Sequence, residues 1–192
     1  MGDCFLKTRE KILKESIKLF AEHGFERTSM SKIASLLGFT KPALYAHYKN
    51  KAALFEACLD TISHEQNTFI KSILENPSYN TVEAKLYFII KDCTLIQENH
   101  AFLFYNRFYL LPPVELKEQI KYRLDESTEK WTSMLMDVIN NAIESGEIDK
   151  SLTKTEVLSS YICILNGIGF EVETKQNLDH IWKIFWRGIK AN

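Results

Sequence analysis

Lys41 and Tyr45 lie four residues apart in a segment whose apolar residues recur at helical spacing. Side chains at this spacing share one face of an α-helix. An ammonium and a phenol that project together are hydrogen-bond donors suited to phosphate oxygens and to the edges of nucleic-acid bases. Leu44 and Tyr48 share a different face at the same spacing and are predicted to point into the protein. The pattern therefore predicts a short helix with one polar contact face.

Two short helices are predicted around this pair. Ser29 is a candidate N-cap for a helix over residues 30–37, which Gly38 ends. Thr40 is a candidate N-cap for a second helix over residues 41–49. Two short helices joined by three residues around a glycine are the sequence form of a helix-turn-helix. The N-terminal end of the second helix in such a motif fits the major groove of B-DNA.

The segment IASLLGFTKPALYAHYKNKAAL closely resembles the helix-turn-helix of the TetR family of bacterial one-component repressors. The pattern of that family runs roughly IAxxAGVSxGTLYxHFxxKxxL. The matching positions are Ile33, Ala34, Gly38, Thr40, Leu44, Tyr45, His47, Tyr48, Lys51 and Leu54. The preceding LFAEHGFERTSM resembles the exit of the family's first helix, so the resemblance covers about residues 8–58.

The resemblance implies that side chains of this motif contact DNA, mostly at phosphates. The expected DNA-binding residues are Thr28, Ser29, Thr40, Lys41, Pro42, Ala43, Tyr45, His47 and Lys51. Pro42 replaces the usual glycine and removes a backbone donor, while Ala43 replaces the usual serine or threonine and removes a hydroxyl. The operator sequence therefore does not follow from the motif. Taken singly, a lysine such as Lys51 is more often a solvated surface residue, and His47 is as often a residue that packs within the motif.

The charge distribution agrees with a contact surface for DNA near the N-terminus. The formal net charge is −1, but residues 1–60 hold 10 basic and 7 acidic side chains, whereas residues 61–192 hold 14 basic and 18 acidic ones. The span Arg27–Phe55 contains five cations and no acidic residue. A small positive face beside an acidic remainder is typical of a nucleic-acid-binding module on a larger body.

The whole chain is predicted to be all-α, with about nine helices, because no segment alternates with period two for long enough to form a strand. Thr8 is predicted to cap the first helix, which Gly24 ends. A long helix follows the pair Pro112–Pro113. Two further helices, roughly over residues 154–173 and 177–190, close the chain.

The resemblance also implies a helical second domain that binds a small effector and forms a dimer. We therefore expect a DNA-binding domain over residues 1–52 and an effector-binding and dimerisation domain over residues 53–192. Aromatic side chains suit the walls of apolar ligand pockets. The candidate pocket residues are Tyr87, Phe88, Phe102, Tyr105, Phe108, Tyr109 and Trp131. Ordinary core packing is the alternative for each of them, and it is the commoner use of aromatic residues at helical spacing.

Small and apolar residues near the C-terminus predict a two-helix contribution to a dimeric four-helix interface. The candidate interface residues are Ile164, Gly167, Ile168, Ile181 and Phe185. Packing within one chain is the alternative for this face. The expected partners are a second copy of the chain, a pseudo-palindromic DNA operator and a small, largely apolar effector whose identity does not follow from the residues.

Motifs for catalysis, metal binding or cofactor binding do not occur in the sequence. It has no HExxH, no GxSxG and no glycine-rich phosphate loop, and its five histidines and four cysteines are scattered. We therefore expect no enzymatic activity, no cofactor and no metal. No apolar run approaches the ~20 residues of a membrane span. The N-terminal residues lack the apolar segment of a signal peptide, so a cytoplasmic location is expected.

Two functions of different classes follow from these observations. The first is a DNA-binding transcriptional regulator, a dimeric repressor modulated by a small ligand. The alternative is a helical small-molecule carrier or enzyme in which residues 28–54 only resemble a DNA reader.

Overall fold

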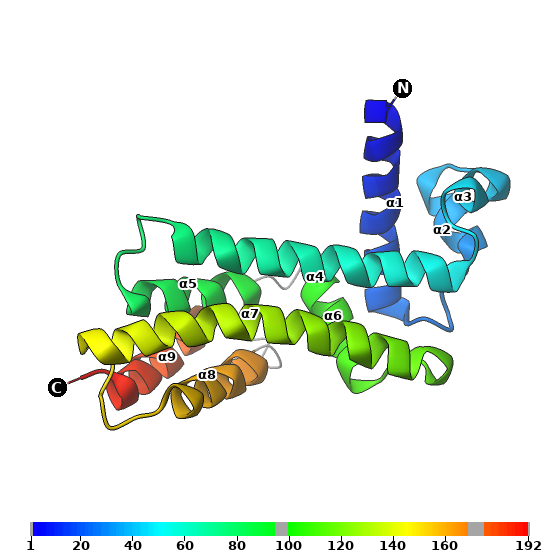
Figure 1. Ribbon diagram of the computed structural model, residues 1–192. Helices are drawn as coiled ribbons and strands as arrows, with labels where there is room; N and C mark the ends of the chain where they lie inside the picture. The colour runs from blue at the N-terminus through cyan, green and yellow to red at the C-terminus, as the bar shows by residue number, and fades with distance from the viewer. Residues whose placement is uncertain (1, 95–99, 169–174, 192) are drawn as a thin grey trace. The chain divides into compact units, whose positions relative to one another are not determined.

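The computed structural model describes residues 2–94, 100–168 and 175–191, and Figure 1 shows their arrangement. These residues form helices and no β-strand apart from one isolated bridge between Ile148 and Lys190. The predicted all-α fold is therefore confirmed. The helices are α1 (Gly2–His23), α2 (Met30–Leu37), α3 (Lys41–His47), α4 (Lys51–Glu75), α5 (Val82–Thr94), α6 (His100–Leu110), α7 (Lys117–Ser145), α8 (Lys154–Ile168) and α9 (Lys175–Ile189), with a 3-10 turn η1 (Val114–Leu116) before α7.

Side-chain caps begin the three helices that follow the first loop, and those of α2 and α3 are the predicted ones. The Ser29 hydroxyl accepts a hydrogen bond from the backbone N–H of Lys32 at 3.2 Å, at the start of α2. Thr40 accepts at the start of α3, from the N–H of Ala43 at 3.4 Å. The Asn50 side chain accepts at the start of α4. Each cap satisfies one of the N–H groups that a helix leaves unpaired at its N-terminus.

Several helix boundaries differ from the prediction: α3 ends at His47 and not at residue 49, and α9 spans Lys175–Ile189 and not residues 177–190. The first helix does not begin after Thr8, because α1 already starts at Gly2. Thr8 is a good cap, but no proline precedes it to stop the helix from extending further back. The predicted helix over residues 154–173 corresponds to α8, which is described up to Ile168; residues 169–173 of the prediction lie outside the described residues.

The chain divides into two compact units. The first comprises Met1–Gln66 and Asn99–Ser127, and the second comprises Asn67–Glu98 and Thr128–Asn192. The chain therefore passes from one unit to the other three times: within α4, between α5 and α6, and within α7. The predicted boundary after residue 52 divides the chain by function and stays a prediction.

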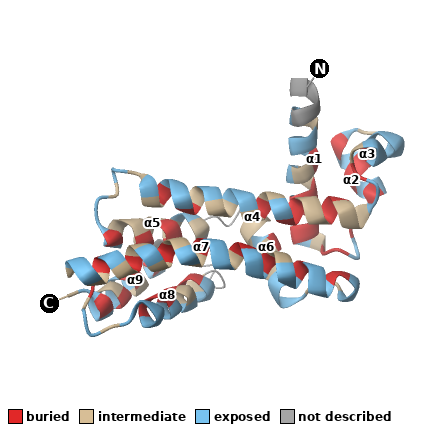
Figure 2. Ribbon diagram, in the orientation of Figure 1, coloured by how far each residue is buried: buried red, intermediate tan, exposed pale blue. Residues whose placement is uncertain are grey.

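The core of the first unit is a cluster of phenylalanine rings from α1, α4, α6 and the turn after α1. Phe55 of α4 is fully buried at its centre. Its ring centroid lies 5.1 Å from that of Phe20, 5.1 Å from that of Phe25 and 4.6 Å from that of Phe108. Phe104 completes the cluster at 5.1 Å. Figure 2 shows the buried residues gathered on the facing sides of these helices. Edge-to-face and offset ring pairs of this kind add to the free energy of burial.

The second unit has a separate core made by α5, α8, α9 and the later parts of α4 and α7. Tyr161 of α8 is fully buried, and its hydroxyl donates a hydrogen bond of 2.8 Å to the carbonyl oxygen of Leu86 in α5. Desolvation raises the pKa of Tyr161 well above its ordinary value, so the phenol stays protonated. Its single donor therefore joins α8 to α5 inside an otherwise apolar core.

Replacement of Phe55 by alanine should lower the free energy of unfolding by about 3–5 kcal/mol, because it leaves a cavity that four rings line. Denaturant titration followed by circular dichroism measures this change. Leu103→Ala, on the exposed side of α6, is the control and should cost less than about 1 kcal/mol. Equal losses in the two variants would show that the phenylalanine cluster is not the centre of the first unit's core.

Candidate DNA-binding surface

The turn between α2 and α3 fixes the geometry of the candidate DNA-binding surface. Gly38 ends α2 with φ +70° and ψ 25°, a left-handed conformation that side chains disfavour. The next residue, Phe39, donates its backbone N–H to the carbonyl oxygen of Ala34 at 2.8 Å. Ile33 and Leu44 are fully buried where the two helices pack. The predicted helix-turn-helix is therefore present, with the predicted residues on its inner face.

The outer face of α3 carries most of the residues expected to contact DNA. Lys41, Pro42 and Ala43 are exposed, and Tyr45 retains 48% of its accessible surface. Lys41 and Tyr45 share one face of the helix, as their spacing predicts. Ser29 and Thr40 are exposed as well, although each hydroxyl already accepts the capping hydrogen bond of its helix. The N-terminal half of α3 thus presents a cation, a phenol and two compact apolar groups.

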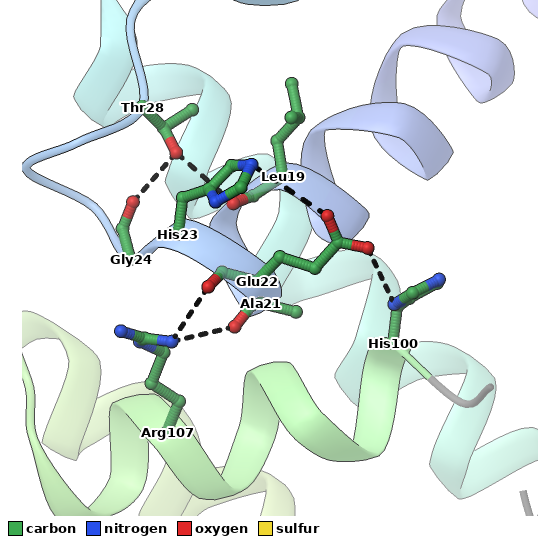
Figure 3. A network of polar contacts seen from close by, with 8 residues as sticks. All are labelled: Leu19, Ala21, Glu22, His23, Gly24, Thr28, His100 and Arg107. Carbon is green, nitrogen blue, oxygen red and sulfur yellow. Dashed lines mark hydrogen bonds and ion pairs between the residues drawn. The ribbon is translucent and has the colours of Figure 1, made fainter. Parts of the chain in front are cut away.

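Thr28 differs from the other expected contact residues because its side chain is buried. Its hydroxyl lies 2.8 Å from the carbonyl oxygen of Gly24, to which it donates, and 3.3 Å from that of Leu19 (Figure 3). The hydroxyl therefore holds the loop between α1 and α2 against the end of α1. A contact between Thr28 and DNA stays a prediction.

Lys51 and His47 lie at the end of the motif, and both are half-buried. The Lys51 ammonium donates to the carbonyl oxygen of Phe25 at 2.9 Å and sits 4.0 Å from the centroid of the Phe25 ring. A hydrogen bond and a cation–π contact thus fix the position of this charge. An ammonium has three donors, so two remain for a phosphate. The role of both residues in DNA binding stays a prediction.

Arg107 of α6 holds the end of α1, a contact that the sequence pattern did not indicate. Its guanidinium donates to the carbonyl oxygen of Ala21 at 2.9 Å and to that of Glu22 at 3.4 Å (Figure 3). It thereby satisfies carbonyl groups that the C-terminus of α1 leaves unpaired. Gly24 follows with φ +80°, and a Cβ atom there would lie 3.2 Å from the guanidinium. The partners are 85 and 86 residues apart, so no local periodicity reveals them.

The Glu22 carboxylate lies between two histidines at the junction of α1 and α6. Glu22 lies 3.9 Å from His23 and 3.9 Å from His100, the first residue of α6 (Figure 3). These groups are one-third or more exposed, so each ion pair contributes little, at most about 1 kcal/mol when the histidine is protonated. The Arg107 contacts therefore dominate the polar part of the junction between α1 and α6.

The candidate pocket residues are divided between the two units. Phe102, Tyr105, Phe108 and Tyr109 lie on α6 in the first unit, whereas Tyr87, Phe88 and Trp131 belong to the second. Phe108 is a core residue of the phenylalanine cluster, which agrees with the alternative of ordinary packing. Tyr109 is 57% exposed and stacks on Tyr105 with a centroid separation of 6.0 Å. A common pocket for these seven residues stays a prediction.

Two aromatic features of the second unit bear on ligand binding. Tyr87 donates a hydrogen bond to Asp179, and burial together with that carboxylate raises the pKa of Tyr87 to about 12. Trp131 is 5% exposed, and its indole N–H has no hydrogen-bond partner among the described residues. A buried donor without an acceptor is uncommon in folded proteins and costs free energy.

The candidate interface residues on α8 and α9 are not all exposed. Ile164, Ile168 and Ile181 are half-buried. Gly167 is exposed, and a Cβ atom added to it would meet nothing within 4 Å. Phe185 is 8% exposed and packs in the core of the second unit beside Trp182. A substitution at Phe185 would therefore test folding before it tested assembly.

The fold and this surface together define a class: an all-α protein with a helix-turn-helix whose second helix is free to enter a DNA groove. Among the described residues, no group of three or more histidine, cysteine or acidic side chains is arranged to hold a metal ion. None of the described helices is long and apolar enough to cross a membrane.

Comparison with known proteins identifies the family. Residues 12–58 match the family model of bacterial regulatory proteins of the tetR family. The nucleoid occlusion factor SlmA of Photobacterium profundum is 24% identical over 199 residues, 95% of this chain and 96% of the relative. The HTH-type transcriptional repressor ComR of Escherichia coli is 26% identical over 92% of this chain and 84% of its own length.

A solved structure shows the same fold. The ketosteroid transcriptional regulator KstR2 of Mycobacterium tuberculosis superposes with a TM-score of 0.69 at 20% identity, over 96% of both chains. Residues 12–58 therefore form a DNA-binding domain of the tetR family, and the comparisons support a DNA-binding transcriptional regulator of this family.

Replacement of Lys51 or Tyr45 by alanine should weaken binding to all duplex sequences alike, because both are expected to contact the DNA backbone. Lys51→Ala should also lower the magnitude of the slope of log affinity against log salt by about one unit per contact. Fluorescence anisotropy over a salt series measures both quantities. Lys154→Ala, the same change at an exposed lysine of the second unit, is the control. Parental affinity and slope in Lys51→Ala and Tyr45→Ala would contradict the proposed docking.

Proposed function

We propose that the protein is a dimeric transcriptional repressor in the cytoplasm, whose binding to a pseudo-palindromic operator changes when a small, largely apolar effector binds. The exposed N-terminal half of α3, with Lys41 and Tyr45 on one face, is the observation that carries the DNA-binding part. Similarity to a protein named as a repressor supports the direction of regulation.

Selection of bound sequences from a random pool of duplex DNA tests the proposal directly. We expect enrichment of two inverted half-sites whose centres lie about 34–36 Å apart, one helical turn of DNA. The selected duplex should then bind with a steep dependence on salt. Recovery of no common sequence, or of a single isolated half-site, would contradict a dimeric reader of a palindrome.

Gly167→Leu and Ile184→Glu should convert the dimer to a monomer and weaken operator binding. Gly167 has open space around its Cα, and Ile184 of α9 is 75% exposed, so neither change disturbs the core of the second unit. Analytical ultracentrifugation at micromolar concentration measures assembly, and melting temperature checks the fold. Val114→Glu is the control, at a residue of the first unit that is 94% exposed. A dimer that persists in both variants would place the interface elsewhere.

The unpaired indole N–H of Trp131 supports effector binding within the second unit. An effector with a hydrogen-bond acceptor on an apolar body would satisfy this donor while it packs against apolar neighbours such as Leu135. The proposal therefore favours apolar molecules that carry a carbonyl, carboxylate or ether oxygen over pure hydrocarbons.

Quenching of tryptophan fluorescence screens for such molecules, and linkage then tests their regulatory role. An effector that lowers operator affinity by a given factor must itself bind less tightly, by the same factor, when operator DNA is present. Couplings of this kind are typically about 5–150-fold. Trp131→Phe keeps the ring shape but removes the donor, and it should weaken acceptor-bearing ligands more than a hydrocarbon of the same size. A molecule that binds the second unit without changing operator affinity would exclude that molecule as the effector.

A further inference from the structure

An open cleft lies beside the C-terminal end of α3 in the first unit. It has a volume of about 510 Å³ and lies between α1, the turn after α3 and the first turns of α4. Its floor is formed by small residues, Ala52, Ala53 and Ala57. The cleft is large enough for a small molecule or for a segment of a larger anionic chain.

The cations of this cleft are not matched by its acids. Arg9 and Lys49 line it together with Glu56 and Asp60. Arg123 of α7 pairs with both carboxylates, at 3.4 Å from Glu56 and in closer contact with Asp60. Two carboxylates thus face three cations, and the acids are already engaged. Three positive charges against two negative ones leave this group a net charge of +1, and this favours an anion.

The Arg9 guanidinium is held in place but keeps most of its donors. Its Nε donates to the Tyr48 hydroxyl at 3.1 Å, and its central carbon lies 5.7 Å from the centroid of that ring. Tyr48 is 5% exposed at the C-terminal end of α3, where burial raises the pKa of its phenol. No further partner of Arg9 occurs in the described part of the chain. Its two terminal amino groups thus form an open fork, the geometry that binds phosphate with two hydrogen bonds.

We propose that Arg9, oriented by Tyr48 and assisted by Lys49, binds a phosphate of the operator backbone next to the groove that α3 enters. The inference rests on DNA binding by α3 and adds a contact from α1, outside the helix-turn-helix. His47 lines the same cleft and is carried by α3, so the cleft is continuous with the recognition helix. In helix-turn-helix complexes, elements next to the recognition helix cross the DNA backbone beside the major groove.

Arg9→Gln tests the charge of this phosphate-binding position, and Arg9→Lys is its matched control. Arg9→Gln should lower the magnitude of the salt slope by about 0.9 per bound subunit and weaken binding about tenfold at 0.1 M salt. Arg9→Lys keeps the charge and should keep the slope, with a smaller loss of affinity. A slope in Arg9→Gln equal to that of the parental protein, at an equal melting temperature, would overturn the proposal.

A labelling experiment tests the same contact in the unaltered protein, so it does not depend on how the variants fold. Phenylglyoxal modifies accessible arginines, and mass spectrometry locates the modified residues. Operator DNA should protect Arg9 but not the exposed Arg187 of α9. Labelling of Arg9 that is unchanged by bound operator would overturn the proposal, while failure of the protein to bind any duplex would contradict DNA binding itself.

Inorganic phosphate distinguishes a free anion from the DNA backbone. At millimolar concentration and constant ionic strength, inorganic phosphate should leave the labelling of Arg9 unchanged. A single contact in an open cleft binds a free anion only weakly. If inorganic phosphate protects Arg9 from labelling saturably and as fully as operator DNA does, the cleft binds a free anion. That result would overturn the assignment of the cleft to the operator backbone.

Discussion

The packing of α1, α4 and α6 around Phe55 is the constraint on which the DNA-binding surface depends. Phe20 and Phe25 come from α1 and the turn after it, and Phe104 comes from α6, so one ring cluster determines where these segments lie. Arg107 then satisfies a carbonyl group at the end of α1, and Lys51 satisfies the carbonyl group of Phe25. Both contacts fix the start of the loop that leads into α2. A recognition helix has to be presented rigidly, because a contact displaced by 1 Å loses much of its hydrogen-bond energy.

The local features of this protein could be predicted from its sequence, because each depends on neighbouring residues. Caps such as Ser29 and the glycine that ends α2 act within one helical turn. The inward direction of Leu44 follows from its spacing alone. The family resemblance added which face of α3 is expected to contact DNA. The predicted start of α1 was wrong, because a threonine permits an N-cap but does not impose one.

The long-range features could not be predicted in this way. Arg9 and Tyr48 are 39 residues apart, and nothing in their local patterns indicates that they meet. The aromatic residues of α6 illustrate the opposite error. Their density suggests a ligand pocket, but periodicity does not distinguish a pocket wall from a core, and Phe108 is a core residue. Phe185 has the same ambiguity, because an apolar helix face can turn toward its own chain or toward a partner.

The three crossings of the chain between its units have a consequence for how such proteins can diversify. An exchange of genetic material at one point after the helix-turn-helix would join a new α1 to the α6 of the recipient. Phe20 would then pack against different side chains in place of Phe104. The end of α1 would also lack the hydrogen bonds from Arg107 unless the recipient had an arginine at that position. Such an exchange is therefore expected to cost stability, whereas changes at exposed side chains of α3, such as Ala43, leave this packing intact. The same barrier applies to chimaeric sensors built by fusion at a single junction.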